Sequence, residues 1–361
     1  MRFLNNRLGL STTYFQYKDG PVISNQSVSE ASGLSYFVTT GLTTKRTGGE
    51  VSITGTPMQK GDFRWDVLVN WATYKEVFAK FAGGVKELGN GTGYPYQVGD
   101  RVDKLFGAME AHTPDGKVIH DESGFPIYLP KAQYLGHADP DWSWGVYNKF
   151  SYKSFSFSFQ FDGMVGGILQ DRVLRKLTEG GRGANTNSGK IGQARLYESI
   201  HWGDVGYAGA VDANGVPILS GDGVQVVGGS SNIQYDPVTG VIINGKSLTY
   251  QQNKTATFWI QDYVSSFFND PQHTMVKKTY AKLREVVITY SLPQKLLQKT
   301  FINKVDFSFV GRNLLYFFPK AFHDIDVDQY PGRDQFNGIS REYNLQTPTT
   351  RSFGFNVNVV F

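Results

Sequence analysis

Apolar and polar residues alternate at every second position in several segments, which is the periodicity of a β-strand with two different faces. The clearest segment is 154–162, where every second residue is phenylalanine and the residues between are polar. The same period appears, each time with one exception, in 63–71, 284–292 and 304–312, and more weakly in 7–17, 50–56 and 142–152. The end of the chain repeats it, with one apolar face formed by Phe353, Phe355, Val357, Val359 and Phe361.

The connections between these segments alternate in length. Short ones lie at 57–61, 153–154 and 293–299, the last predicted to hold a short turn of helix, and long ones at 18–47, 75–141, 165–277 and 315–349. Structureless connections beyond about 12–15 residues are rare in compact soluble domains, whereas outer-membrane barrels join tight periplasmic turns to long extracellular loops. The order predicts an all-β fold, an antiparallel transmembrane β-barrel segment of about eight strands with a periplasmic C-terminus.

The long connections are expected to contain structure of their own. Residues 113–116 and 236–240 carry turn residues between apolar runs, so each predicts a small hairpin. Residues 169–177 are predicted to be helical, and the glycine-rich segment 180–190 that follows is predicted to be flexible.

Composition favours strands and turns over helices. Aromatic residues make up 14% of the chain, glycine numbers 41, charged residues are 19%, and the mean hydropathy is −0.32. No apolar run reaches the roughly 18 residues of a membrane helix, so a chain of this kind crosses a bilayer as a barrel. The net charge of +4 is dispersed without a basic run, which argues against a nucleic-acid partner. The absence of cysteine excludes disulfides and thiolate metal sites.

The first eight residues have neither the apolar core nor the cleavage site of a signal peptide. We therefore expect the chain to be part of a longer envelope protein. A sheet cut from a wide barrel has unpaired edges, so we also expect a curved, incomplete wall with open edges at 2–17 and 350–361.

Several motifs together resemble those of SusC/RagA-type TonB-dependent outer-membrane transporters. Residues 280–293 (YAKLREVVITYSLP) resemble the family strand "KLREV…Y.LP", and 309–314 (FVGRNL) resemble "GRNL". Residues 136–145 (GHADPDWSWG) are similar to "GNPNPDFTWG", although His137 and Ala138 depart from it. Residues 47–51 are similar to part of "NKGVEL", and the terminal Phe361 resembles the signal that barrel-assembly machinery recognises. These segments span the chain in the family's order.

The resemblance implies a barrel of about 22 strands around an N-terminal plug, located in the cell outer membrane. It implies a SusD-like surface lipoprotein as a cap, and import of oligosaccharides or peptides driven by TonB–ExbB–ExbD through the missing N-terminal part. Residues 1–361 would then be the C-terminal part of the barrel, with the plug domain and signal peptide absent. The resemblance implies no cofactor.

Aromatic residues in the long connections are the candidate contact residues. They either stack on sugar rings, contact the cap protein or pack within the connections; they are Trp202, Tyr207, Tyr250, Trp259 and Tyr263.

Three carboxylates at alternate positions, Asp324, Asp326 and Asp328, resemble the start of a calcium loop, but Gln329 stands where that motif needs glycine. They form either a loop calcium site or a solvated strand end.

No catalytic set emerges from the sequence, so we predict that the chain is not an enzyme. Segment 180–190 fails the spacing of a phosphate-binding loop, and the histidines lack metal-site spacing. Asp139 and Asp141 carry no sign of a catalytic pair. The alternative function is a secreted or surface all-β carbohydrate-binding or structural protein, in which the phenylalanines of 154–162 are buried between two sheets. An outer-membrane barrel enzyme is a third option.

Overall fold

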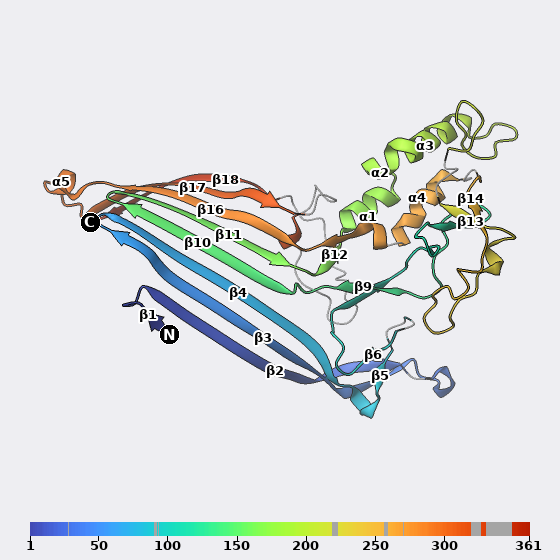
Figure 1. The fold of residues 1–361 in the computed structure, drawn as a ribbon, viewed down its shortest axis with the longest axis horizontal. Coiled ribbons are helices and arrows are strands. Elements are labelled where there is room, and N and C mark those ends of the chain that lie inside the picture. Colours follow the sequence, from blue (N-terminus) through green and yellow to red (C-terminus); the bar gives the residue numbers. More distant parts are fainter. Residues whose placement is uncertain are drawn as a thin grey trace.

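The computed structural model describes the chain apart from residues 28, 90, 91, 93, 219–222, 256–258, 270, 319–325 and 330–348. Its main element is a nine-stranded antiparallel sheet in which the strands follow the order of the sequence (Figure 1). The strands are β1 (Arg2–Phe3), β2 (Leu8–Ser27), β3 (Tyr36–Lys60), β4 (Phe63–Lys80), β10 (Trp142–Tyr152), β11 (Phe155–Val165), β16 (Tyr280–Ser291), β17 (Lys304–Phe317) and β18 (Ser352–Val360). Every segment predicted as a strand overlaps one of these strands other than β1.

The smaller elements gather mainly at one end of the sheet, opposite α5 (Gln294–Leu297) and the C-terminus (Figure 1). The helices are α1 (Arg172–Glu179), α2 (Ala184–Asn187), α3 (Gly189–His201) and α4 (Ile260–Asn269), with 3₁₀ turns at Glu30–Ser32, Ala82–Gly84, Ser230–Asn232, Pro271–Thr274 and Val327–Gln329. The short strands are β5 (Glu87–Leu88), β6 (Tyr96–Gln97), β7 (Lys104–Gly107), β8 (Ile119–His120), β9 (Gln133–His137), β12 (Ile168–Gln170), β13 (Val224–Val226), β14 (Tyr250–Gln252) and β15 (Met275–Lys277). We call this part the outer region. None of the described helices is long and apolar enough to cross a membrane.

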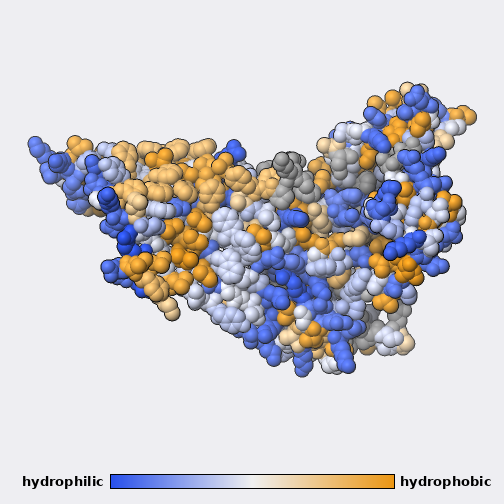
Figure 2. All heavy atoms as spheres, viewed as in Figure 1, coloured by the Kyte–Doolittle hydropathy of each residue, from blue (hydrophilic) through white to orange (hydrophobic). Residues whose placement is uncertain are grey.

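One face of the sheet, which we call the outward face, carries the alternating apolar residues. Phe157 lies in register with Phe150 on β10 and Ile288 on β16. Phe155 is 57% exposed and Phe355 is 69% exposed. Figure 2 shows apolar residues gathered over the part of the sheet formed by β16–β18. The alternative in which these phenylalanines are buried between two sheets is therefore wrong, because no second sheet in the described part of the chain covers them.

Aromatic residues on the outward face form two rows across the strands. The row near the short turns joins Phe63, Tyr152, Phe155, Tyr290 and Phe307 in register. Eight positions along β4 from Phe63, a second row pairs Trp71 with Trp144. Further aromatic residues lie on the same face between the two rows, namely Trp65, Phe150, Phe157 and Phe159. Aromatic side chains therefore occur along the whole length of this face.

The opposite face of the sheet, which we call the inner face, is polar and hydrogen-bonded between strands. The Ser291 hydroxyl donates to Asp306 Oδ1 at 2.6 Å, and the hydroxyls of Thr289 and Ser308 lie 2.9 Å apart. Such cross-strand pairs satisfy polar side chains on a wetted surface.

The sheet is an open, curved wall, as predicted. Its strand order runs linearly from β1 to β18, and in the described part of the chain β18 pairs only with β17. The short connections are confirmed as well, since β3 meets β4 at residues 61–62 and α5 lies between β16 and β17.

The prediction of a long connection at 18–47 is wrong. β2 and β3 continue as a paired ribbon until Ser27 meets Tyr36, which leaves 28–35 as the connection. The ribbon is rich in threonine, which favours strands without an apolar alternation. A buried cluster supports it, formed by Leu42, Phe78, Phe81, Tyr96 and Val102.

The predicted hairpins at 113–116 and 236–240 are confirmed by bridges between His112 and Val118 and between Tyr235 and Ile242. The helix predicted at 169–177 is confirmed as α1, which begins three residues later, at Arg172. It begins there because Asp171 caps it by accepting a hydrogen bond from the Leu174 amide at 2.9 Å. The prediction that segment 180–190 is flexible is wrong, because the segment contains α2 and the start of α3. Arg195 donates to the Gly181 carbonyl and thereby fixes this turn.

Candidate functional site

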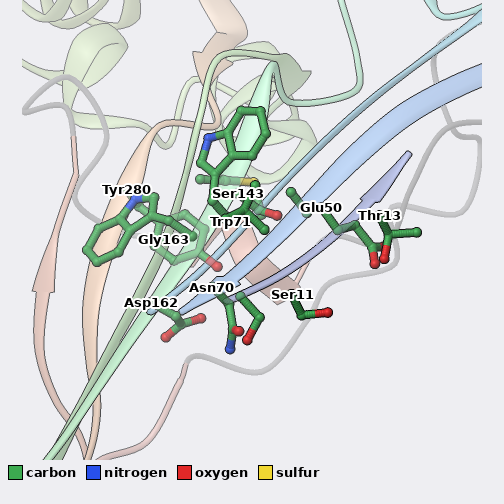
Figure 3. A pocket seen from close by; sticks show the side chains of 14 residues that line it. Ser11, Thr13, Glu50, Asn70, Trp71, Ser143, Asp162, Gly163 and Tyr280 are labelled. Carbon is green, nitrogen blue, oxygen red and sulfur yellow. The ribbon is translucent and has the colours of Figure 1, made fainter. Parts of the chain in front are cut away.

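A groove of about 420 Å³ lies on the inner face, close to the outer region. Its walls come from five neighbouring strands and the start of β16, and they present hydroxyl, amide and carboxylate groups (Figure 3). The polar lining residues are Ser11, Thr13, Glu50, Ser52, Asn70, Ser143, Asp162 and Tyr280. Such a lining forms hydrogen bonds with a polar solute in water and provides no nucleophile–base pair.

Gly163 lies at one end of this groove and packs closely against its neighbours, in register with Trp144 of the outward face. A Cβ at this position would lie 2.2 Å from the Tyr280 carbonyl oxygen and 2.9 Å from Trp144 Nε1. Because only glycine avoids both contacts, β11 can approach β16 closely here.

A charged network lies directly beside the groove. Lys282 Nζ is 2.5 Å from Asp326 Oδ2 and 3.0 Å from Asp328 Oδ2. Arg284 lies 2.6 Å from Asp328 Oδ2 through one nitrogen, and it also holds Asp162 in a two-bond pair of 2.6 and 2.7 Å. Asp162 therefore belongs to both the groove and the network.

A β-bulge in β16 places the cations on one face. The register of β16 shifts between Leu283 and Glu285 relative to β17, and β11 shows a shift at the same level. Arg284 is the extra residue, so Lys282, Arg284 and Glu285 all face inward. Two cations at 282 and 284, next to the apolar run of β16, are the signal in the sequence that points to this network.

The network is covered by an apolar cluster. Val327 is 1% exposed and packs with Leu169, Val276 and Tyr280. Its backbone amide donates to the Tyr316 hydroxyl at 3.0 Å. The Lys282 side chain is only 2% exposed as a result.

Burial and the neighbouring Asp328 raise the pKa of Asp326, against the lowering effect of the Lys282 ammonium. In this arrangement Lys282 and Arg284 supply the positive charge to Asp326 and Asp328. The third residue of the calcium hypothesis, Asp324, lies outside the described residues, so that hypothesis stays untested. Among the described residues no group of histidine and carboxylate side chains is arranged to hold a metal ion.

Three of the predicted aromatic contact residues come together at the end of α3. The rings of Trp202 and Trp259 lie 4.3 Å apart, and those of Trp202 and Tyr207 lie 6.1 Å apart. Both tryptophans are about half exposed. Glu198 organises the cluster, since its Oε2 accepts from the Tyr207 hydroxyl at 2.9 Å and from the Ile260 amide at 3.1 Å. Burial and this hydrogen bond raise the pKa of Tyr207.

The other two predicted contact residues lie elsewhere. Tyr263 is 6% exposed and packs in the core between α3 and α4. It is therefore a core residue and not part of the exposed tryptophan cluster. Tyr250 lies in β14 and donates to the Gly245 carbonyl at 2.9 Å. Exposed apolar residues extend the tryptophan cluster along α3; we call Leu196, Ile200, Trp202, Val205 and Trp259 the α3 patch.

Asp139 and Asp141 lie at a structural junction. Asp139 is 5% exposed, and its backbone amide donates to Asp103 Oδ2 at 2.9 Å. Asp141 accepts from His137 Nε2 at 3.1 Å at the start of β10.

No family model matches the sequence. Among curated proteins the chain is 24% identical over 203 residues to "TonB-dependent receptor P3" of Formosa agariphila, a match that covers 49% of this chain and 20% of the relative. Among solved structures, a chain of the RagAB peptide transporter matches 98% of this chain with a TM-score of 0.56 and 16% identity. A RagAB peptide importer in the "closed-closed" state gives a TM-score of 0.57 and 14% identity. The chain spans about a third of those solved chains and a fifth of the curated relative.

The open sheet with one aromatic and one polar face thus has the fold of part of a RagAB chain. Together with the sequence match to a TonB-dependent receptor, this confirms the resemblance to SusC/RagA-type TonB-dependent outer-membrane transporters.

Proposed function

We propose that residues 1–361 form the C-terminal sector of the barrel wall of a TonB-dependent importer in the cell outer membrane. The observation that carries the proposal is the two-faced sheet, with exposed aromatic residues on the outward face and a polar groove on the inner face. Lipid contact stabilises the outward face, and water fills the space beside the inner face.

The open edges of the sheet support a wider barrel. An unpaired strand edge in hydrocarbon leaves amide and carbonyl groups without partners, each at a cost of several kcal/mol. Further strands therefore pair with the β1–β2 edge and with β18. In the family that this chain resembles, the closed barrel has about 22 strands.

The ends of the sheet suggest its orientation. The short turns at 61–62 and 153–154 lie at the same end of the sheet as the C-terminus. Short turns are periplasmic in outer-membrane barrels, which supports a periplasmic C-terminus and an outer region that faces the exterior. The exposed outward face of β18 fits the proposed assembly signal formed by Phe353, Phe355, Val357, Val359 and Phe361.

We assign the α3 patch to contact with a SusD-like surface lipoprotein. Leu196 and Ile200 are 63% and 66% exposed, one helical turn apart, and Trp202 continues the surface. Exposed apolar surface of this kind is typical of docking sites. TonB–ExbB–ExbD would act through parts of the protein other than these residues.

The solute is an oligosaccharide or a peptide. The hydroxyl and amide lining of the groove suits either, and the structurally similar RagAB is a peptide transporter. Growth of a gene-deletion strain on a single oligosaccharide or peptide source distinguishes the two classes. Growth equal to the parent strain on every source would contradict an import role.

Adjacent cysteines test the two faces directly. Residues 1–361 contain no cysteine, and labelling of the unsubstituted whole protein corrects for any cysteine elsewhere. In the whole protein in its outer membrane, we expect Ser158→Cys to react with a charged, water-soluble maleimide and Phe157→Cys to remain unreactive. Both variants should react after denaturation. Equal reaction of both in the membrane would overturn the proposed lipid-facing surface.

A further inference from the structure

The segment Asp326–Gln329 is folded against the inner face of the sheet. Asp326 and Asp328 both reach Lys282, and Val327 between them enters the apolar cluster on β12, β15 and β16. Gln329 donates to the Thr349 hydroxyl, which in turn donates to Asp326. The segment therefore has polar and apolar contacts on the same wall.

The segment lies beyond one end of the groove. Tyr280 lines the groove, is 6% exposed and belongs to the same buried cluster as Val327. Met164 also lines the groove and packs against the same cluster. Arg284 connects the two features, since it binds Asp328 of the segment and Asp162 of the groove.

We propose that Lys282 and Arg284 hold Asp326–Gln329 on the inner wall as a releasable anchor, and that its release lengthens the groove at the Tyr280 end. This proposal rests on the proposed import function in one respect only, namely that the inner face borders water. The anchor itself rests on the contacts within the chain.

The charge balance explains why the anchor is releasable. Two cations are shared among three carboxylates: Lys282 contacts Asp326 and Asp328, and Arg284 contacts Asp328 and Asp162. Buried carboxylates are stable only while they are paired. Removal of one cation therefore leaves the segment with uncompensated buried charge and drives it toward water.

Thiol labelling tests the anchor in the whole protein in its outer membrane. Val327→Cys keeps a small apolar side chain at the centre of the anchor and should react slowly with a water-soluble maleimide. We expect Lys282→Met to raise its labelling rate at least tenfold. Adding Asp326→Asn to Lys282→Met should lower the rate again, because it removes a carboxylate that has lost its cation. If the rate is unchanged in Lys282→Met, or is not lowered by Asp326→Asn, the charge-held anchor is overturned.

Two controls separate release from general unfolding. Lys304→Met removes an exposed lysine that pairs with Asp306 two residues further along β17, and it should leave Val327→Cys protected. Ala194→Cys, at a fully buried position of the outer region, should stay protected in Lys282→Met. Exposure of Ala194→Cys as well would mean that the network maintains the whole fold, which contradicts a local anchor.

A third cysteine tests the groove. Met164→Cys should label faster in Lys282→Met than with Lys282 present, because the groove has lengthened. If Val327→Cys is released while Met164→Cys is unaffected, the link between anchor and groove is wrong. None of these readouts requires transport, so failure of the anchor and failure of the import proposal are distinguishable.

Discussion

Asn148 shows how the outward face accommodates a polar side chain. It lies in register between Val67 and Phe159, among the apolar residues, and is 8% exposed. Trp65 Nε1 donates to its Oδ1 at 3.0 Å. In hydrocarbon an unpaired amide oxygen costs several kcal/mol, so an indole one strand away makes asparagine acceptable there. Single residues are thus tolerated according to their partners rather than their polarity.

Tyr207 is expected to ionise later than an ordinary tyrosine. Burial and the hydrogen bond to Glu198 raise its folded pKa. A raised pKa means that the stabilisation is fully present below the unfolded pKa, near 10, and is lost as the pH rises through the folded pKa. The tyrosinate absorbance of the parent minus that of Tyr207→Phe isolates this residue. The difference should appear only above pH 10, and a difference centred at pH 10 would contradict the Glu198 contact.

At the scale of elements, the alternation of apolar and polar residues identified strands only where one face of the sheet is apolar and the other is polar. Residues 63–71 alternate because one face is apolar and the other polar, and β4 was predicted there. Its continuation to Lys80 carries Glu76, which pairs with Arg46, and Phe78, which packs in a local cluster, so no apolar–polar alternation marks it. Strand length beyond the apolar band depends on such long-range packing, which no local pattern encodes.

The cap of α1 offers a test within the outer region. Asp171→Ala removes the acceptor for the Leu174 amide and should destabilise the helix by about 1 kcal/mol. Asp171→Asn keeps an acceptor and is the matched control. Hydrogen exchange at the amides of α1 should accelerate about fivefold in the alanine variant only. Equal exchange in both variants would show that α1 is held by its packing on α4 alone.

At the scale of the whole molecule, the sequence predicted the open wall but only part of the candidate site. The strand period and the order of connections were sufficient for the sheet. Trp202, Tyr207 and Trp259 were named, yet their association depends on the meeting of α3 and α4. The anchor was missed because it joins β16 to residues 326–328, more than 40 positions away, across a bulge that shifts the face of Arg284.

Two adjacent valines test the assignment of faces for the molecule as a whole. Val286 pairs with Phe159 and Gly311 on the outward face, near the middle of the apolar band, whereas Val287 pairs with Ser158 and Val310 on the inner face. Val286→Arg should cost about 2–4 kcal/mol because arginine enters hydrocarbon, and Val287→Arg should cost much less because it enters water. The urea midpoint of the heat-modifiable, folded band measures the difference. Since both variants make the same change in the same strand, a loss confined to Val286→Arg requires a lipid-facing side, and equal losses would assign the apolar face to another environment.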